Sequence, residues 1–233
     1  MSQNLFKWKH FESEIILLCV RWYLKYPLSY RMLVEMMTER GLTITHTTVM
    51  RWVHQYSPII NEKVRKHLKQ TNDSWRMDET YIKIKGKDCY LYRAVDSFGK
   101  TIDFFVSENR DKNTAKEFFR KALGASHNQQ PRAITTDKYG ATEVAIIELI
   151  YSGDISSKVT HRMVKYLNNI IEQDHRFIKR KVKPMLGFES FENAEKTIAG
   201  IEIMHMLRKG QIEEIRCVLS EVEFINKIMG AMA

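Results

Sequence analysis

Residues 75–98 read WRMDETYIKIKGKDCYLYRAVDSF, and this stretch decides the fold that the sequence predicts. Apolar and polar side chains alternate in both of its halves, which is typical of β-strands with one buried face. The Gly86–Lys87 pair between the halves is a hairpin turn signal. A further alternating run, TIDFFVSE at 101–108, follows directly. The sequence therefore predicts three consecutive strands.

Beyond these strands, helical patterns alternate with short apolar runs, which is typical of a mixed α/β sheet flanked by helices. Helices are expected at 111–125, 141–152, 166–183, 190–209 and 211–229, and short strands at 131–137 and 157–161.

The first 60 residues have a different texture and predict three short helices. Pro27 ends the first, Ser29 is a good N-cap for the second, and Thr45 can cap the third, which Pro58 closes. Three short helices with a glycine-containing turn before the last are typical of a helix-turn-helix domain.

In such a domain the third helix is the recognition helix, and its early exposed turns carry Thr47, Thr48 and Arg51 as candidate DNA contacts. A helical bundle used for packing or dimerisation is the alternative. We expect a helix-turn-helix domain at 1–60, a polar linker at 61–72 and an α/β domain with C-terminal helices at 73–233.

The chain is strongly basic, with a net charge of +9 and a pI near 9.4. The excess is concentrated, since residues 162–183 contain seven Lys or Arg against two acids. Clustered positive charge favours a polyanionic partner, usually nucleic acid. A basic protein without such a partner is the simpler alternative.

Residues 166–183, YLNNIIEQDHRFIKRKVK, predict an amphipathic helix. One arc of the helix is apolar and faces a core: Leu167, Ile171, Ile178 and Val182. The neighbouring arc carries Glu172, His175, Arg176, Lys179 and Lys183. Glu172 either forms a surface ion pair with Arg176 or is a functional acid within a positive stripe.

Three acids are candidates for one site. Asp78 lies inside a strand, Asp137 ends the strand at 131–137, where ligands of α/β sheets commonly gather, and Glu172 lies on the basic helix. Three carboxylates suit Mg²⁺ or Mn²⁺. Two such ions can activate a water or a 3′-hydroxyl and stabilise the leaving oxygen of a phosphodiester.

Each acid also has a simpler interpretation. Asp78 can be a solvent-facing strand residue, and Asp137 can cap a helix or make a turn with Gly140. Asp96 and Asp111 compete as candidates, but the first lies in the turn signal DSFG and the second begins a helix.

The three cysteines, Cys19, Cys89 and Cys217, are far apart and have no metal-binding spacing. We expect reduced thiols in a cytoplasmic protein. The sequence shows neither a signal peptide nor an apolar run of transmembrane length, so no membrane partner is expected.

Three segments together resemble the DDE transposases of bacterial insertion sequences, and the insertion-sequence-six family most closely. They are WRMDETYIKIKGK (75–87), AITTDKYGAT (133–142) and KYLNNIIEQDHRFIKR (165–180). The 34 residues between Asp137 and Glu172, and a basic residue seven positions after Glu172, agree with that family. The resemblance extends from about Tyr26 to about Gln211.

The resemblance implies an RNase H-like catalytic domain in which Asp78, Asp137 and Glu172 bind Mg²⁺, with Mn²⁺ as a possible substitute. It implies that Lys179 contacts DNA near the scissile phosphate, with His175 and Arg176 as neighbours. Lys183, on the same arc of the predicted helix, is a further candidate contact. It further implies cleavage at terminal inverted repeats, joining to target DNA, and at least a homodimer acting on double-stranded DNA of the bacterial nucleoid.

Three other functions remain open from the residues alone. A nuclease or integrase of the same fold would cut DNA without joining it. A helix-turn-helix regulator with an inactive second domain would bind DNA without using the three acids. A decayed element copy would do neither reaction, although an intact triad argues against decay.

Overall fold

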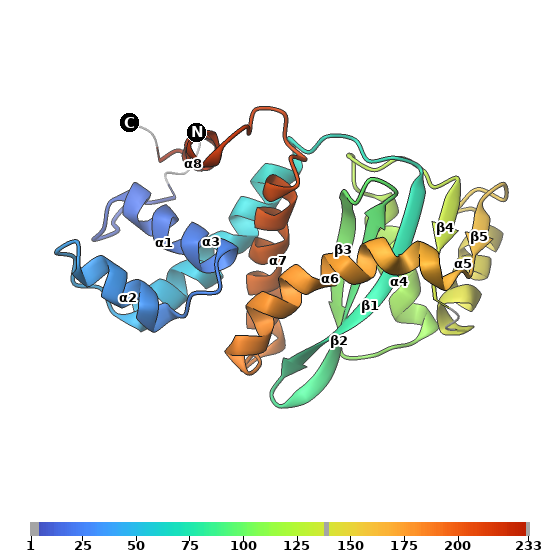
Figure 1. The fold of residues 1–233 in the computed structure, drawn as a ribbon, viewed down its shortest axis with the longest axis horizontal. Coiled ribbons are helices and arrows are strands. Elements are labelled where there is room, and N and C mark those ends of the chain that lie inside the picture. Colours follow the sequence, from blue (N-terminus) through green and yellow to red (C-terminus); the bar gives the residue numbers. More distant parts are fainter. Residues whose placement is uncertain (1–4, 138–139, 232–233) are drawn as a thin grey trace. The chain divides into compact units, whose positions relative to one another are not determined.

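The predicted hairpin is present in the structure, a computed structural model that describes residues 5–137 and 140–231 (Figure 1). Strands β1 (Ser74–Ile84) and β2 (Lys87–Asp96) pair antiparallel. Lys85 and Gly86 make the turn with φ values of 50° and 75°, and two positive φ values are what a type I′ hairpin turn requires.

The sheet grows on both sides of this hairpin. The further strands are β3 (Thr101–Ser107), β4 (Ala133–Thr135) and β5 (Thr160–Arg162). Their order is β3-β2-β1-β4-β5, with β3 antiparallel to β2, and with β4 and β5 parallel to β1. This mixed sheet confirms the predicted RNase H-like α/β fold class.

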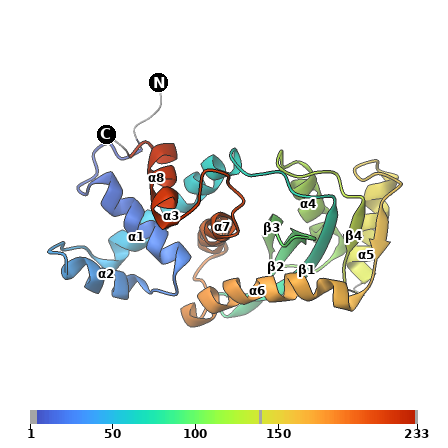
Figure 2. The same cartoon turned by 45° about the horizontal axis from the view of Figure 1, so that its top comes forward.

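Helices cover the two faces of the sheet differently, as Figure 2 shows. One face packs on α4 (Lys112–Leu123) and α5 (Gly140–Tyr151). The other carries α6 (Asn169–Val182), which follows the short helix η1 (Lys165–Asn168) and precedes η2 (Lys183–Met185). The core under α4 and α5 contains Trp75, Met77, Tyr92, Ile102, Phe118, Phe119 and Ile146, all at most 1% exposed.

The chain divides into two compact units. One is Lys69–Phe188, which contains the sheet, and the other combines the chain up to Leu68 with the chain from Glu189 onward. The helical unit contains α1 (Ser13–Lys25), α2 (Tyr30–Thr38), α3 (His46–Arg65), α7 (Phe191–Arg208) and α8 (Val218–Met229).

Two helix starts in this unit confirm the expected caps. The Ser29 hydroxyl accepts a hydrogen bond from Met32 N at 3.1 Å, and the Thr45 hydroxyl accepts one from Thr48 N at 3.2 Å. The expected end of the third helix at Pro58 is wrong, because α3 continues to Arg65. Proline removes one backbone hydrogen bond, but the buried side chains beyond it, Ile60 and Val64, hold the last turns in the core.

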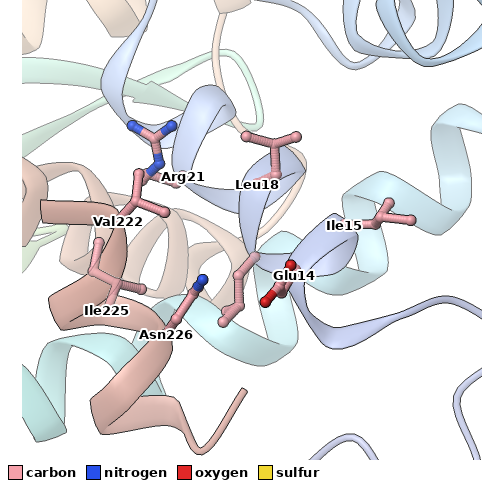
Figure 3. Close-up of a pocket in the computed structure, with 8 residues that line it drawn as sticks. Glu14, Ile15, Leu18, Arg21, Val222, Ile225 and Asn226 are labelled. Carbon is pink, nitrogen blue, oxygen red and sulfur yellow. The ribbon is translucent and has the colours of Figure 1, made fainter. Parts of the chain in front are cut away.

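The C-terminal helices also differ from the expected division, which placed 73–233 in one domain. α7 packs on α3, and at Gly200 the backbones approach closely. On α8, Glu221 forms buried ion pairs with Arg21 (3.3 Å) and Lys25 (2.6 Å) of α1. An apolar groove lies between parts of α1 and α8, lined by Ile15, Leu17, Leu18, Val222 and Ile225 together with the polar residues Glu14, Arg21 and Asn226 (Figure 3).

In the described part of the chain, every helix is too short or too polar to span a lipid bilayer.

Gly200 tests the packing of α7 in the helical unit. A Cβ at this position would lie 2.7 Å from a methyl group of Leu24 and 2.8 Å from Ser57 Cβ. Gly200→Val is expected to lower the free energy of unfolding by about 2 kcal/mol or more, because overpacking forces neighbours to shift. Urea unfolding followed by tryptophan fluorescence measures this change.

Ala199→Val is the matched control, since it introduces the same β-branched residue at a half-buried neighbouring position. Its cost should stay below about 1 kcal/mol, the scale of helix propensity. Equal losses in the two variants would contradict the close packing of α7.

Candidate active site

Two of the three predicted acids meet because of strand register. Arg76 of β1 lies opposite Thr135 of the parallel strand β4. Two residues further along each strand direction come Asp78, still within β1, and Asp137, just after β4. Adjacent strands are about 4.8 Å apart. The Asp78 side chain is 20% exposed and the Asp137 side chain 43% exposed, so both remain accessible to a ligand.

A third acid, Glu79, joins this pair. Oxygen atoms of Asp78, Glu79 and Asp137 all lie within 4.8 Å of one another. Glu79 was not predicted from the sequence, because strand alternation places it on the face of β1 opposite to that of Asp78. Its position directly beside Asp78 at the accessible part of β1 is the signal that could have identified it.

Arg110, from the loop between β3 and α4, provides positive charge to this acid cluster. Its Nη2 lies 3.2 Å from Glu79 Oε2 and 3.7 Å from Asp137 Oδ2. The Glu79 side chain is only 3% exposed. The pKa of Glu79 is raised to about 7, mainly by burial; Arg110 lowers this pKa, whereas the Asp137 and Asp78 carboxylates add to the increase.

Glu172 lies at the first turn of α6, on an exposed position at the rim of the same site. It lines an open cleft of about 560 Å³ together with Asp78, Glu79, Asn169, Gln173, His175, Arg176 and Lys179. Among the described residues no ion pair joins Glu172 to Arg176. The structure thus places all three predicted acids around one region, with Glu172 outside the tight cluster of the other three carboxylates.

α6 is fixed on the sheet by contacts with buried polar groups. Arg93 of β2, which is directly opposite Asp78 and 0% exposed, donates a 2.7 Å hydrogen bond from Nη2 to Asp174 Oδ2. Its guanidinium also lies 5.0 Å from the centre of the Phe177 ring. Just before α6, in η1, the Leu167 carbonyl accepts a hydrogen bond of 2.8 Å from Arg76 Nε of β1.

His175 requires a correction. The sequence predicts a DNA contact at this position, but the His175 side chain is buried. Its Nε2 lies 3.2 Å from Asp78 Oδ2 and its Nδ1 lies 3.5 Å from Arg93 Nη1. The helical wheel placed His175 on the polar arc beside the apolar one, and the structure shows that it belongs to the buried side.

The other predicted DNA contacts differ in their surroundings. Arg176 and Lys179 are exposed and line the cleft, and Lys183 is exposed on η2. On α3 of the helical unit, Thr47 and Arg51 are exposed, while Thr48 is half-buried. The Thr48 hydroxyl is 2.8 Å from the Thr45 hydroxyl, so it takes part in the helix cap.

The two competing acids have structural roles, as their local sequence indicated. Asp96 is fully buried and accepts backbone hydrogen bonds from Asn72, Phe98 and Lys100 at 2.9–3.0 Å, which closes the turn before β3. Asp111 caps α4 by accepting from Thr114 N at 2.8 Å.

The donor set at the acid cluster fits a divalent cation. Carboxylate oxygens from two adjacent strands lie within 4.8 Å of one another, and hard oxygen donors of this kind are the preferred ligands of Mg²⁺ and Mn²⁺. Glu172 provides a further carboxylate at the cleft.

Comparison with known proteins identifies the family. A family model described as a DDE domain matches residues 72–211. The chain is 41% identical to the transposase for insertion sequence-like element IS431mec of Staphylococcus aureus over 207 residues, which covers 88% of this chain and 89% of that protein. The chain belongs to the insertion-sequence-six family of DDE transposases.

A second relative agrees with this assignment. The transposase for insertion sequence element IS257 in transposon Tn4003, also from Staphylococcus aureus, is 40% identical over the same share of both chains. Among solved structures, two forms of the HTLV-2 integrase catalytic core domain match this transposase with TM-scores of 0.44 and 0.45, at 17% and 18% identity. They cover 57% and 61% of this chain and 84% and 97% of the integrase chains.

Arg110→Met tests the electrostatics of the acid cluster. The substitution keeps the length of the side chain and removes the charge that faces Glu79 and Asp137. Without metal, the transposase should lose about 2 kcal/mol of stability, because the buried Glu79 carboxyl group is left without its hydrogen-bond partner. Thermal unfolding, measured in EDTA and in Mn²⁺, should also show that added metal raises the Tm of Arg110→Met more than the Tm of the wild type.

Arg132→Met is the control, since Arg132 pairs with Asp73 on an exposed surface and such pairs contribute little. If Arg110→Met and Arg132→Met have the same Tm in EDTA and the same response to Mn²⁺, the proposed balance of charge at the cluster is wrong.

Proposed function

We propose that this transposase cleaves the strands at the terminal inverted repeats of its element and joins the freed ends to target DNA, with Asp78, Asp137 and Glu172 as the catalytic acids. The observation that carries the proposal is the convergence of Asp78 and Asp137 from parallel strands on one accessible point. Glu172 lines the same cleft from α6.

The three acids would hold Mg²⁺, and Mn²⁺ fits the same donors. Bound metal would supply activation of a water or a 3′-hydroxyl and stabilisation of the leaving oxygen of the phosphodiester. Glu79 lies close enough to contribute a fourth carboxylate. The positive charge of Arg110, which faces Asp137 after β4, would offset part of the negative charge of the cluster.

Positive side chains beside the acids would position the DNA. Arg176 and Lys179 line the cleft, and their charge suits the phosphates on either side of the scissile bond. Lys183 would extend this contact along the backbone. These contacts carry no sequence information, so recognition of the element end is assigned to another part of the chain.

Recognition of the terminal repeats is assigned to α3. Thr47 and Arg51 are exposed on its first turns, where a recognition helix contacts base edges, and Thr48 stabilises the start of the helix. Because two element ends have to be held together, the active complex is expected to be a homodimer or larger. Its place of action is the bacterial cytoplasm, at the nucleoid DNA.

A strand cleavage and joining assay tests the proposed chemistry. The substrate is a labelled duplex with the element's terminal repeat, incubated with target DNA and Mg²⁺. The wild type should give joined product, and Glu172→Gln, which keeps the shape and removes the charge, should give none above background. Asp78→Asn and Asp137→Asn should behave in the same way.

Other results would favour the alternatives. Cleavage without joined product in the wild type would indicate a nuclease of the same fold. Sequence-specific binding without either reaction, unchanged in Glu172→Gln, would indicate a DNA-binding regulator.

Lys179→Ala tests the DNA contact at the cleft. Its activity should fall about tenfold or more, because a charge-assisted contact to phosphate contributes about 1.5 kcal/mol or more. The slope of log affinity against log salt concentration should also become shallower by about 1, as expected for one lost phosphate contact.

Lys112→Ala provides the comparison, because Lys112 is an equally basic, exposed residue that pairs with Glu148 on the surface of α4 and α5. It should retain activity and the salt slope of the wild type. Equal effects of the two substitutions would show that Lys179 has no special place on the DNA-binding face.

A further inference from the structure

His175 is buried in the centre of a polar chain that connects the acid cluster to the interior of the protein. The chain runs from Asp78 through His175 to Arg93 and ends at Asp174, with distances of 3.2, 3.5 and 2.7 Å. His175 is 2% exposed and Arg93 is 0% exposed. Burying a polar group costs free energy unless the group is hydrogen-bonded. The contacts along this chain therefore hold the His175 ring in a defined orientation.

The chemistry of Arg93 decides which nitrogen of His175 carries the proton. A guanidinium group has only donors. The Nδ1 atom that faces Arg93 Nη1 must therefore accept a hydrogen bond, and in the neutral ring the proton is on Nε2. This Nε2–H points to Asp78 Oδ2, so His175 donates to the carboxylate.

We infer that His175 is a positioning residue for the proposed metal site: it holds Oδ2 of Asp78 and thereby directs Oδ1 toward the cation. The inference rests on the proposed function, in which Asp78 is a metal ligand. Hydrogen bonds to a ligating side chain fix its orientation and commonly change metal affinity about 10- to 100-fold. Arg93 and Asp174 act one step further away, since they fix the ring of His175.

Two amide substitutions separate this role from a merely structural one. In His175→Gln the amide nitrogen is at the position of Nε2 and can still donate to Asp78. In His175→Asn the amide group corresponds to Nδ1, so it faces Arg93 and does not reach Asp78. Both variants keep a polar group in the buried space, and matched Tm values in EDTA show that they are equally folded.

Binding of Mn²⁺ to the full chain without DNA, followed through the electron paramagnetic resonance signal of free Mn²⁺, is the direct readout. His175→Gln should bind Mn²⁺ with an affinity near that of the wild type. His175→Asn and His175→Ala should bind about 10- to 100-fold more weakly. In strand transfer, the same two variants should need more metal for half-maximal rate and recover most of their rate at saturating metal.

Equal Mn²⁺ affinities of the Gln and Asn variants, whether strong or weak, would overturn the inference. Asp78→Asn separates this outcome from a failure of the proposed function. If Asp78→Asn abolishes Mn²⁺ binding while the Gln and Asn variants do not differ, only the role of His175 is lost. If Asp78→Asn binds Mn²⁺ as the wild type does, the metal site itself is wrongly assigned, and the inference falls with it.

Discussion

The burial of one permanently charged residue, Arg93, constrains the catalytic unit more than any other interaction. Its side chain is 0% exposed, and a buried charge without a partner costs about 3–5 kcal/mol. Asp174 and Phe177 of α6 supply that partner and a covering ring, so these contacts anchor α6 on the sheet in this register. With α6 fixed, Glu172 and Lys179, two helical turns apart, both line the cleft beside Asp78. The position of the site thus depends on a contact outside it.

Local signals in the sequence predict much of this fold. Alternation and the Gly86–Lys87 turn signal predict the hairpin, whose turn lies one residue earlier, at Lys85 and Gly86. Ser29 and Thr45 predict helix starts, because each acts within a few residues of its own position. The continuation of α3 through Pro58 and the packing of α7 in the helical unit were not predictable in this way. Both depend on apolar burial against segments more than a hundred residues away, which periodicity alone does not identify.

The candidate site shows the same difference between local signals, which the sequence reveals, and contacts between distant segments, which it does not. Asp78 and Asp137 could be paired from the sequence, because each lies at a recognisable position of a strand in a parallel arrangement. Glu79 was missed because strand alternation directs it away from Asp78, and Arg110 because its approach to Glu79 depends on the course of the loop between β3 and α4. His175 was assigned to the exposed face because a helical wheel gives directions but not the depth at which a helix lies. The actual environment of His175 is set by Arg93, which comes from β2 of the sheet.

Anomalous diffraction from crystals of the full chain soaked with Mn²⁺ is the most direct test of the central claim, that strand register and the docking of α6 assemble one metal site. The account predicts anomalous density at the acid cluster, with carboxylate oxygens of Asp78, Asp137 and Glu172 as ligands and with His175 on the remaining oxygen of Asp78. Manganese bound elsewhere, or bound at the cluster without Glu172, would contradict it.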